Sequence, residues 1–177
     1  PTSMNRKSEQ KLNRPMMNKT KPEDKFDKVF NEELGCLPGE VHLETDKTVK
    51  PTILPPRRLP HAIKPKVKSE LDSLVSKGII TPVVEPTQWV SQLAVAEKRN
   101  GKLRICIDPK PLNKALKRAH YPLPVIDDIL PELAQARVFS KLDLSSAFWQ
   151  INLDTDSSRL TTFNSPFGRY RWIRLPF

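Results

Sequence analysis

The chain has 177 residues, including 18 prolines and 5 glycines, and a formal net charge of +10. This length can bury one ordinary hydrophobic core, and the proline content favours extended connections over flexible turns. The positive charge favours a polyanionic partner such as nucleic acid. A membrane protein is not expected, because no apolar run approaches the roughly 20 residues of a transmembrane helix and no amphipathic basic helix or lipidation signal occurs.

Neither the cysteines nor the histidines predict a metal centre. Cys36 and Cys106 lie far apart in different predicted elements, so we expect two free thiols rather than a disulfide framework or a zinc site. His42, His61 and His120 have no companions at ligand spacing, which favours structural roles for all three. The polar N-terminus carries no secretion signal, and a cytoplasmic location is expected.

Residues 1–25 are expected to form a disordered basic linker. They contain seven basic and three acidic residues, almost no aliphatic side chains and no periodicity. The chain begins with Pro1 rather than methionine, so we expect it to be a piece of a longer polyprotein.

Residues 26–63 are predicted to be a mostly extended connection. Apolar positions within residues 26–39 allow one short helix that ends near Gly35. Residues 49–56 contain three prolines and must be extended, because each proline biases its predecessor away from helix.

The clearest helix covers residues 64–77, at the start of a region predicted for residues 64–137. Pro65 fits the first turn, and Gly78 can end the helix. Four apolar side chains form one face that should pack on a sheet: Val67, Leu71, Leu74 and Val75.

Two apolar runs, residues 89–96 and 103–107, predict a β-hairpin. Asn100 and Gly101 between them are typical of a two-residue hairpin turn. Trp89 is expected to anchor the base of the hairpin as a core residue.

A second helix is predicted for residues 125–136. Its apolar face contains Ile126, Ile129, Leu130 and Leu133. Pro131 is expected to kink or break it. Asp127 and Asp128 are adjacent carboxylates, but their place in the first turn, at the positive end of the helix dipole, explains them without catalysis.

Residues 138–144 open a last region and are predicted to form a short strand. Asp143 would then end a core-bound element, where an unpaired carboxylate is costly. A divalent metal carrying a phosphate would compensate, because magnesium prefers one or two carboxylates plus phosphate oxygens. The alternative is that Asp143 caps the turn through Ser145 and Ser146.

Three further strands are predicted to complete a mainly antiparallel sheet, at residues 149–153, 160–163 and 170–175. Gly168 is expected at a turn.

A cluster of basic side chains covers the predicted hairpin and the residues after it. Between residues 98 and 118, eight basic residues accompany one acid, Asp108, which gives a net charge of +7. The eight are Lys98, Arg99, Lys102, Arg104, Lys110, Lys114, Lys117 and Arg118. Alternate side chains of a strand share one face, so Lys102 and Arg104 can project together and clamp a phosphate. A solvated basic hairpin tip is the alternative.

Seven short blocks of sequence follow one another in an order that is more specific than any single block. They are residues 89–91 (Trp-Val-Ser), 100–109 (Asn-Gly-Lys-Leu-Arg-Ile-Cys-Ile-Asp-Pro), 112–114 (Leu-Asn-Lys), 120–124 (His-Tyr-Pro-Leu-Pro), 139–153 around Asp143, 160–163 (Leu-Thr-Thr-Phe) and 167–177. From about Phe26 onward, the chain resembles the reverse transcriptase of gypsy-type LTR retrotransposon polyproteins.

The resemblance implies an α+β fold, namely part of a right-hand polymerase. Residues 64–137 would form the fingers, with a β-hairpin and helices, and residues 138–177 the first part of an antiparallel palm sheet. In the family, a Tyr/Phe-x-Asp-Asp turn further along the palm supplies the other catalytic carboxylates, and this sequence has no such turn. We therefore expect a fragment of an RNA-directed DNA polymerase, a nucleotidyltransferase, that is inactive alone. The alternative is a non-enzymatic nucleic-acid-binding remnant of a retroelement.

The resemblance also implies roles for individual residues. Asp143 aligns with the first catalytic metal ligand, the backbone carbonyl of Leu144 lies beside it, and two Mg²⁺ or Mn²⁺ ions would serve the complete enzyme. Phe148 aligns with the aromatic residue that rejects a ribose 2′-hydroxyl, although a purely structural role in the palm core is the alternative. The implied deoxynucleotide-binding residues are Lys98, Arg104, Ser145, Ser146, Ala147 and Phe148. The implied template–primer residues are Lys110, Asn113 and Lys114.

The implied partners are an RNA or DNA template–primer, deoxynucleoside triphosphates and the remainder of the polyprotein, with its palm, thumb and ribonuclease H. No membrane partner is expected. An active element of this family would place the protein in cytoplasmic virus-like particles.

Overall fold

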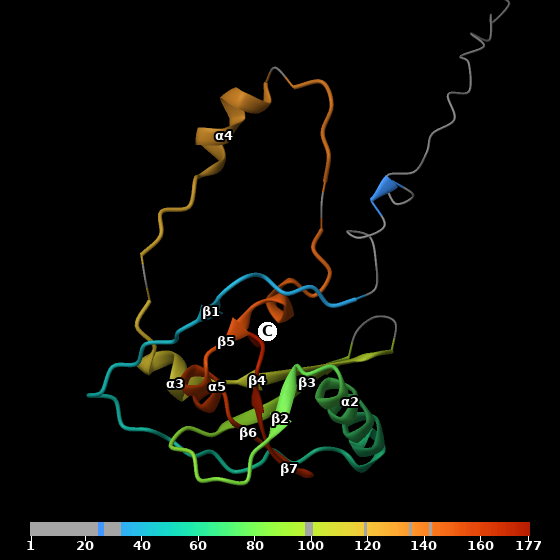
Figure 1. Cartoon of the computed structure of the whole chain (residues 1–177), viewed down its shortest axis with the longest axis vertical. Helices are drawn as coiled ribbons and strands as arrows, with labels where there is room; N and C mark the ends of the chain where they lie inside the picture. The colour runs from blue at the N-terminus through green and yellow to red at the C-terminus, as the bar shows by residue number, and fades with distance from the viewer. Residues whose placement is uncertain (1–24, 27–32, 98–100, 119, 135, 142) are drawn as a thin grey trace, which may run out of the picture. The chain divides into compact units, whose positions relative to one another are not determined.

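The computed structural model describes residues 25–26, 33–97, 101–118, 120–134, 136–141 and 143–177 (Figure 1). Nearly all of the predicted linker, and Lys98, lie outside the described residues. The chain divides into two units, Pro1–Glu33 and Leu34–Phe177. In the first unit, the Lys25 ammonium lies 5.9 Å from the centroid of the Phe26 ring. The elements described below belong to the second unit.

The helix predicted for residues 64–77 is confirmed as α2 (Lys64–Ser76), which follows the short 3₁₀ helix η1 (His61–Ile63). Pro65 lies in its first turn. Gly78 has a φ of +65°, the left-handed conformation that often ends a helix and that glycine adopts without strain. The buried residues of the helix are Val67, Leu71 and Leu74.

Five strands form one mixed sheet beside α2. In spatial order they are β2 (Ile80–Pro82), β7 (Gly168–Trp172), β6 (Phe163–Ser165), β3 (Ser91–Glu97) and β4 (Leu103–Asp108). Only the β3–β6 pair of this sheet is parallel, so the mainly antiparallel arrangement and the α+β class are confirmed. Strands of the segments predicted as fingers and palm share this sheet, and Gly168 lies at the predicted turn.

The β3–β4 hairpin is confirmed, and residue 100 of the predicted two-residue turn lies outside the described residues. The last described pair of the two strands is Glu97 with Leu103. The observed register places Val95 opposite Ile105. A shift by one residue would move one strand's apolar side chains to the other face of the sheet, so the apolar pattern of the two strands favours this register.

The main core forms where α2 packs on the sheet. It includes the α2 side chains, residues of β2, β3 and β4, and the aromatic rings of β6 and β7. The Phe163 ring lies 5.9 Å from the Tyr170 ring and 6.0 Å from the Trp172 ring. A smaller core joins Trp89 to Leu112 and Ala115 of α3 (Lys110–Ala115). Trp89 is therefore a core residue at the start of the hairpin, as predicted.

Residues 34–56 run as an irregular strap. Residues 27–32, which hold most of the predicted short helix, lie outside the described residues, and residues 26 and 33–39 are not helical. The Leu37 N–H donates to the Gln150 carbonyl at 2.7 Å. The strap then forms β1 (Glu40–Val41), which pairs in parallel with β5 (Asn152–Leu153).

The proline-rich part of the strap is extended, as predicted for residues 49–56. The Leu54 N–H donates to the Val90 carbonyl at 2.9 Å, and the Val90 N–H donates to the Thr52 carbonyl at 3.1 Å. The strap therefore adds its backbone beside the start of β3.

The strand predicted for residues 138–144 is wrong. The described residues of this stretch are irregular, and Asp143 is exposed rather than buried at the end of a core element. Val138 and Phe139 are 86% and 67% exposed. A strand needs a neighbour to pair its backbone groups, and in the described part of the chain no strand pairs with this stretch.

The helix before that stretch is confirmed as α4 (Ile126–Leu133). The helix continues for two residues beyond Pro131, so it is not broken at the proline itself. The Asp128 carboxylate accepts a hydrogen bond from the Val125 N–H at 3.3 Å, which supports the structural explanation of the acidic first turn. The apolar side chains of α4 are exposed.

Two of the remaining predicted strands begin later than expected. Residues 149 and 150 belong to the 3₁₀ helix η2 (Ala147–Gln150), and β5 follows it. Residue 160 is the last residue of α5 (Thr155–Leu160), a helix that the Asp154 carboxylate caps at its N-terminus, and β6 follows. Cys36 and Cys106 are free thiols, as predicted. No helix in the described ranges combines the length and the hydropathy needed to cross a bilayer.

Candidate nucleotide site and basic surface

The stretch from Asp143 to Gln150 makes a tight turn. Ser146 has a φ of +51°, in the left-handed region that non-glycine residues seldom adopt. The Trp149 N–H donates to the Ser146 carbonyl at 2.9 Å, and the Gln150 side-chain amide donates to the Ser145 carbonyl at 3.0 Å. A strained backbone that is held in place in this way is common at functional sites.

This turn and strand β4 line one pocket of about 490 Å³. The turn contributes Asp143, Leu144, Ser145, Ser146, Ala147, Phe148 and Trp149. Strand β4 contributes Leu103, Arg104 and Ile105, and the lining is completed by Glu70 of α2 and by Phe177. The fold thus brings together the described residues that are predicted to bind a metal and a deoxynucleotide, and Lys98 lies outside the described residues.

Arg104 reaches this pocket because it lies on the exposed face of β4. Ile105 and Ile107, which take alternate positions of the strand, are buried, as the alternation of side chains in a strand predicts. The guanidinium carbon of Arg104 lies 4.9 Å from the centroid of the Phe177 ring. At this distance the ring attracts the cation.

An aromatic cluster forms part of the lining of the pocket. The Phe177 ring lies 5.5 Å from the Phe148 ring and 5.1 Å from the Trp149 ring, both in edge-to-face arrangements. Phe148 is 49% exposed. In the described residues its ring therefore lines the pocket rather than the core.

Asp143 contributes an exposed carboxylate to the lining of the pocket, and Glu70 contributes a partly buried one. No three His, Cys, Asp or Glu side chains of the described residues lie close enough to hold a metal ion together. This donor set fits magnesium only if substrate oxygens complete the coordination, which is how magnesium is usually bound beside phosphates.

A separate basic surface is built on α3. Lys110 has 83% of its side chain exposed and lies 3.9 Å from Asp108, and Asp108 also lies 3.9 Å from Arg57, the residue that follows the strap. Asn113 and Lys114 are exposed on the same short helix. The three predicted template–primer residues are thus on one element, outside the pocket.

Comparison with known proteins gives the family. Residues 96–177 match the family model described as "Reverse transcriptase (RNA-dependent DNA polymerase)". Residues 96–177 belong to the reverse transcriptase family. The chain is also 39% identical, over 126 residues, to the retrovirus-related Pol polyprotein from transposon 412 of Drosophila melanogaster. That match covers 68% of this chain and 10% of the polyprotein.

Solved reverse transcriptases share the fold. The prototype foamy virus protease–reverse transcriptase superposes with a TM-score of 0.72 at 22% identity, covering 87% of this chain and 21% of that one. The foamy viral enzyme in complex with an RNA/DNA hybrid gives a TM-score of 0.68, at 22% identity and the same coverage of each chain. The chain therefore has the fold of part of a right-hand polymerase, and it spans about a fifth or less of these relatives' lengths.

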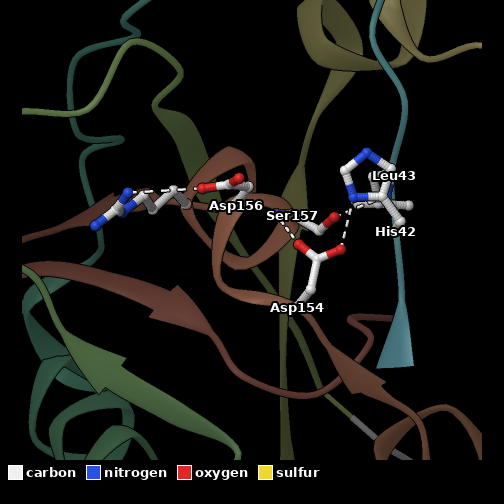
Figure 2. A network of polar contacts seen from close by, with 6 residues as sticks. His42, Leu43, Asp154, Asp156 and Ser157 are labelled. Atoms are coloured by element: carbon white, nitrogen blue, oxygen red, sulfur yellow. Dashed lines mark hydrogen bonds and ion pairs between the residues drawn. The ribbon is translucent and has the colours of Figure 1, made fainter. Parts of the chain in front are cut away.

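Sequence reasoning missed a polar network that joins the strap to α5 of this reverse-transcriptase segment (Figure 2). The His42 ring nitrogen lies 2.6 Å from one Asp154 oxygen, and the other oxygen accepts the Ser157 N–H at 2.7 Å. The Ser157 hydroxyl accepts the Leu43 N–H at 2.7 Å. First the Ser157 N–H and then the His42 ring hold the pKa of the Asp154 carboxyl below its usual range.

A second contact joins the strap to the residues after α3. The Lys117 ammonium lies 2.6 Å from the Glu44 carboxylate, which lowers the pKa of Glu44 and raises that of Lys117. Lys117, one of the eight basic residues of the cluster, is thus paired with a carboxylate of the strap. The partners are 73 residues apart in the sequence, so no local pattern indicates this contact.

Proposed function

We propose that the chain is part of an RNA-directed DNA polymerase and that the pocket between β4 and the Asp143 turn holds an incoming deoxynucleoside triphosphate. One observation carries the proposal: Arg104 and the turn residues, far apart in the sequence, line a single pocket in a chain of the reverse transcriptase family. The volume of about 490 Å³ is in the range of small-molecule sites.

Arg104 would bind the triphosphate. A guanidinium offers a planar fork of donors that matches phosphate oxygens, and the exposed face of β4 leaves it accessible. Lys98 would be a second phosphate ligand, and the backbone at Ser145, Ser146 and Ala147 would border the base and sugar.

The Asp143 carboxylate and the Leu144 carbonyl would hold a divalent metal, Mg²⁺ or Mn²⁺, with two ions in the complete enzyme. When bound, the metal neutralises phosphate charge and favours attack by the primer hydroxyl. Phe148 would exclude a 2′-hydroxyl, because its half-exposed ring lies at the pocket.

The α3 surface would contact the template–primer through Lys110, Asn113 and Lys114. Its basic, exposed side chains suit a sequence-independent interaction with phosphates. The foamy viral relative that was solved with an RNA/DNA hybrid supports a nucleic-acid partner of this kind.

The origin is proposed at a finer level than the family. We propose a gypsy-type LTR element, whose polyprotein would supply the remaining palm, thumb and ribonuclease H, and whose cytoplasmic virus-like particles would contain the protein. The transposon 412 polyprotein supports the retroelement origin.

Nucleotide binding by the chain tests the central part of the proposal. Titration of Mg²⁺ and dATP, followed by NMR, should perturb residues of the pocket. Arg104→Ala should weaken binding about tenfold to a hundredfold, as expected for loss of hydrogen bonds to a charged group. Arg159→Ala is the matched control, because Arg159 is exposed and pairs with Asp156 at 3.6 Å, away from the pocket. Equal effects of the two variants would contradict the proposed site.

A further inference from the structure

Phe177 contacts two residues to which the proposed function gives roles, Arg104 for the triphosphate and Phe148 for the sugar. Among the described residues, its ring lies 4.9 Å from the Arg104 guanidinium, 5.5 Å from the Phe148 ring and 5.1 Å from the Trp149 ring. Arg104 belongs to β4, whereas Phe148 and Trp149 belong to η2. One side chain therefore contacts both walls of the pocket.

Each of these contacts uses a specific property of an aromatic ring. The face of the ring carries partial negative charge and attracts the guanidinium, and edge-to-face packing joins the positive edge of one ring to the negative face of another. The interplanar angles of 77° with Phe148 and 61° with Trp149 correspond to such packing. An aliphatic side chain of similar volume would fill the space without these attractions.

The contact with Phe177 orients Arg104 without using its donors. Within the described residues, no carboxylate lies within 4.0 Å of the Arg104 guanidinium, although Glu70 lines the same pocket. A carboxylate partner would occupy the N–H groups and compete with an incoming phosphate. An aromatic face holds the cation and leaves all five N–H donors available.

We infer that Phe177 is a positioning residue that holds the Arg104 guanidinium ready for the triphosphate and fixes the Phe148 ring beside the sugar. The expected effect on nucleotide binding rests on the proposed function, but the placement of Arg104 by Phe177 can be measured without any nucleotide.

The first experiment therefore uses the free chain. NMR spectra are compared for the wild type, Phe177→Leu and Phe177→Tyr, with Phe167→Leu as a control because Phe167 is an exposed phenylalanine outside the pocket. The ring current of Phe177 should shift the side-chain signals of Arg104 in the wild type and in the Tyr variant. Those signals should return to ordinary positions in Phe177→Leu and stay unchanged in the control. Arg104 signals that do not respond to Phe177→Leu would overturn the inference.

The second experiment measures affinity for dATP in Mg²⁺. Phe177→Leu should weaken binding about twofold to fivefold, the usual range for an accessible cation–π contact, and Phe177→Tyr should retain wild-type affinity. In an Arg104→Ala background, Phe177→Leu should have no further effect. The same loss in that background would show that Phe177 acts by packing alone and would overturn the inference.

Two further outcomes remain decisive. If Phe177→Leu does not fold, a ring-fluorinated phenylalanine at position 177 replaces it, because fluorination keeps the shape of the ring and reduces the negative charge of its face. This substitution should also lower the affinity for dATP. Unchanged affinity would overturn the inference. If the wild type binds no nucleotide, the proposed function fails, whereas the spectra of the free chain still decide whether Phe177 positions Arg104.

Discussion

Asp154 connects the strap to α5 through two polar contacts. Substitution of Asp154 tests how much these contacts stabilise the fold. One carboxylate oxygen caps the helix through the Ser157 N–H, and the other contacts His42. Loss of an N-cap lowers the free energy of unfolding by about 0.5–2 kcal/mol. The His42 side chain is 66% exposed, so its contact contributes only about 0.2–1 kcal/mol.

Asp154→Ala should therefore lower the free energy of unfolding by roughly 1–3 kcal/mol. Asp154→Asn keeps an oxygen that can accept the Ser157 N–H and loses only the charge, so its effect should stay below about 1 kcal/mol. Urea denaturation followed by tryptophan fluorescence measures both, with an unchanged m-value as the check that unfolding remains two-state. In thermal scans each kcal/mol corresponds to about 2–4 °C for a domain of this size.

Asp156→Ala is the matched control, since Asp156 lies two residues away, has 82% of its side chain exposed and forms an ion pair with Arg159. Its effect should remain within about 0.5 kcal/mol. If Asp154→Ala and Asp156→Ala were equally mild, the argument for a cap and a fastened strap would be refuted.

The pH dependence of the same variants tests the role of charge. The pKa of Asp154 is lowered in the folded chain, so its ionised form stabilises the fold above the unfolded pKa of about 3.9. That stabilisation is lost as the pH falls through the lower folded pKa. The difference in stability between the wild type and Asp154→Asn should therefore shrink below about pH 4. A difference that is constant between pH 7 and pH 3 would mean that the charge is not involved.

Three other predictions concern the core, the basic surface and the sugar site. Leu71→Ala should lower the free energy of unfolding by about 2–5 kcal/mol because Leu71 is fully buried. Leu123→Ala, at a 78% exposed position, should change it by less than about 0.5 kcal/mol, and equal effects would contradict the packing of α2. Charge reversal at Lys110 and Lys114 should weaken duplex binding and reduce the slope of log K against log salt by about 2, and an unchanged slope would place the nucleic-acid contacts elsewhere. In a longer, active polyprotein segment, Phe148→Val should raise the ratio of ribonucleotide to deoxyribonucleotide kcat/KM by roughly tenfold to a hundredfold, and a constant ratio would make Phe148 a packing residue.

The parts of the fold that the sequence predicts well are those in which one segment carries its own signal. Pro65 and Gly78 bracket α2, and alternating apolar residues mark β3 and β4. The register of these strands is also set by their apolar pattern, because a shift by one residue would move the apolar side chains of one strand to the other face of the sheet.

The parts that the sequence predicts poorly depend on a partner far away in the chain. Residues 138–144 have the composition of a strand, but a strand exists only where another strand pairs with it, and composition carries no information about that neighbour. The contact of His42 with Asp154 joins residues 112 positions apart, and nothing at either position indicates the other. The cap at Asp154, by contrast, was readable from an aspartate three residues before Ser157 at the start of a helix.

The candidate site lies between these two cases. Family resemblance indicated Arg104, Asp143 and Phe148 one by one, because each belongs to a local motif, and the fold places all three at one pocket. Phe177 was not singled out, although it ends a block that carries the resemblance, because its contribution depends on which residues surround its ring.

The charges around the pocket distinguish it from the basic surface of α3. Among the described lining residues, the titratable groups are one guanidinium, from Arg104, and two carboxylates, from Glu70 and Asp143. An unaccompanied triphosphate would meet more negative than positive charge there, so the pocket is a poor general anion site. A metal-bound nucleotide reverses this balance, because the cation interacts favourably with both the carboxylates and the phosphates. The exposed lysines of α3 need no such cation, which suits a surface that follows a nucleic-acid backbone, while the pocket is suited to a ligand that arrives with its metal.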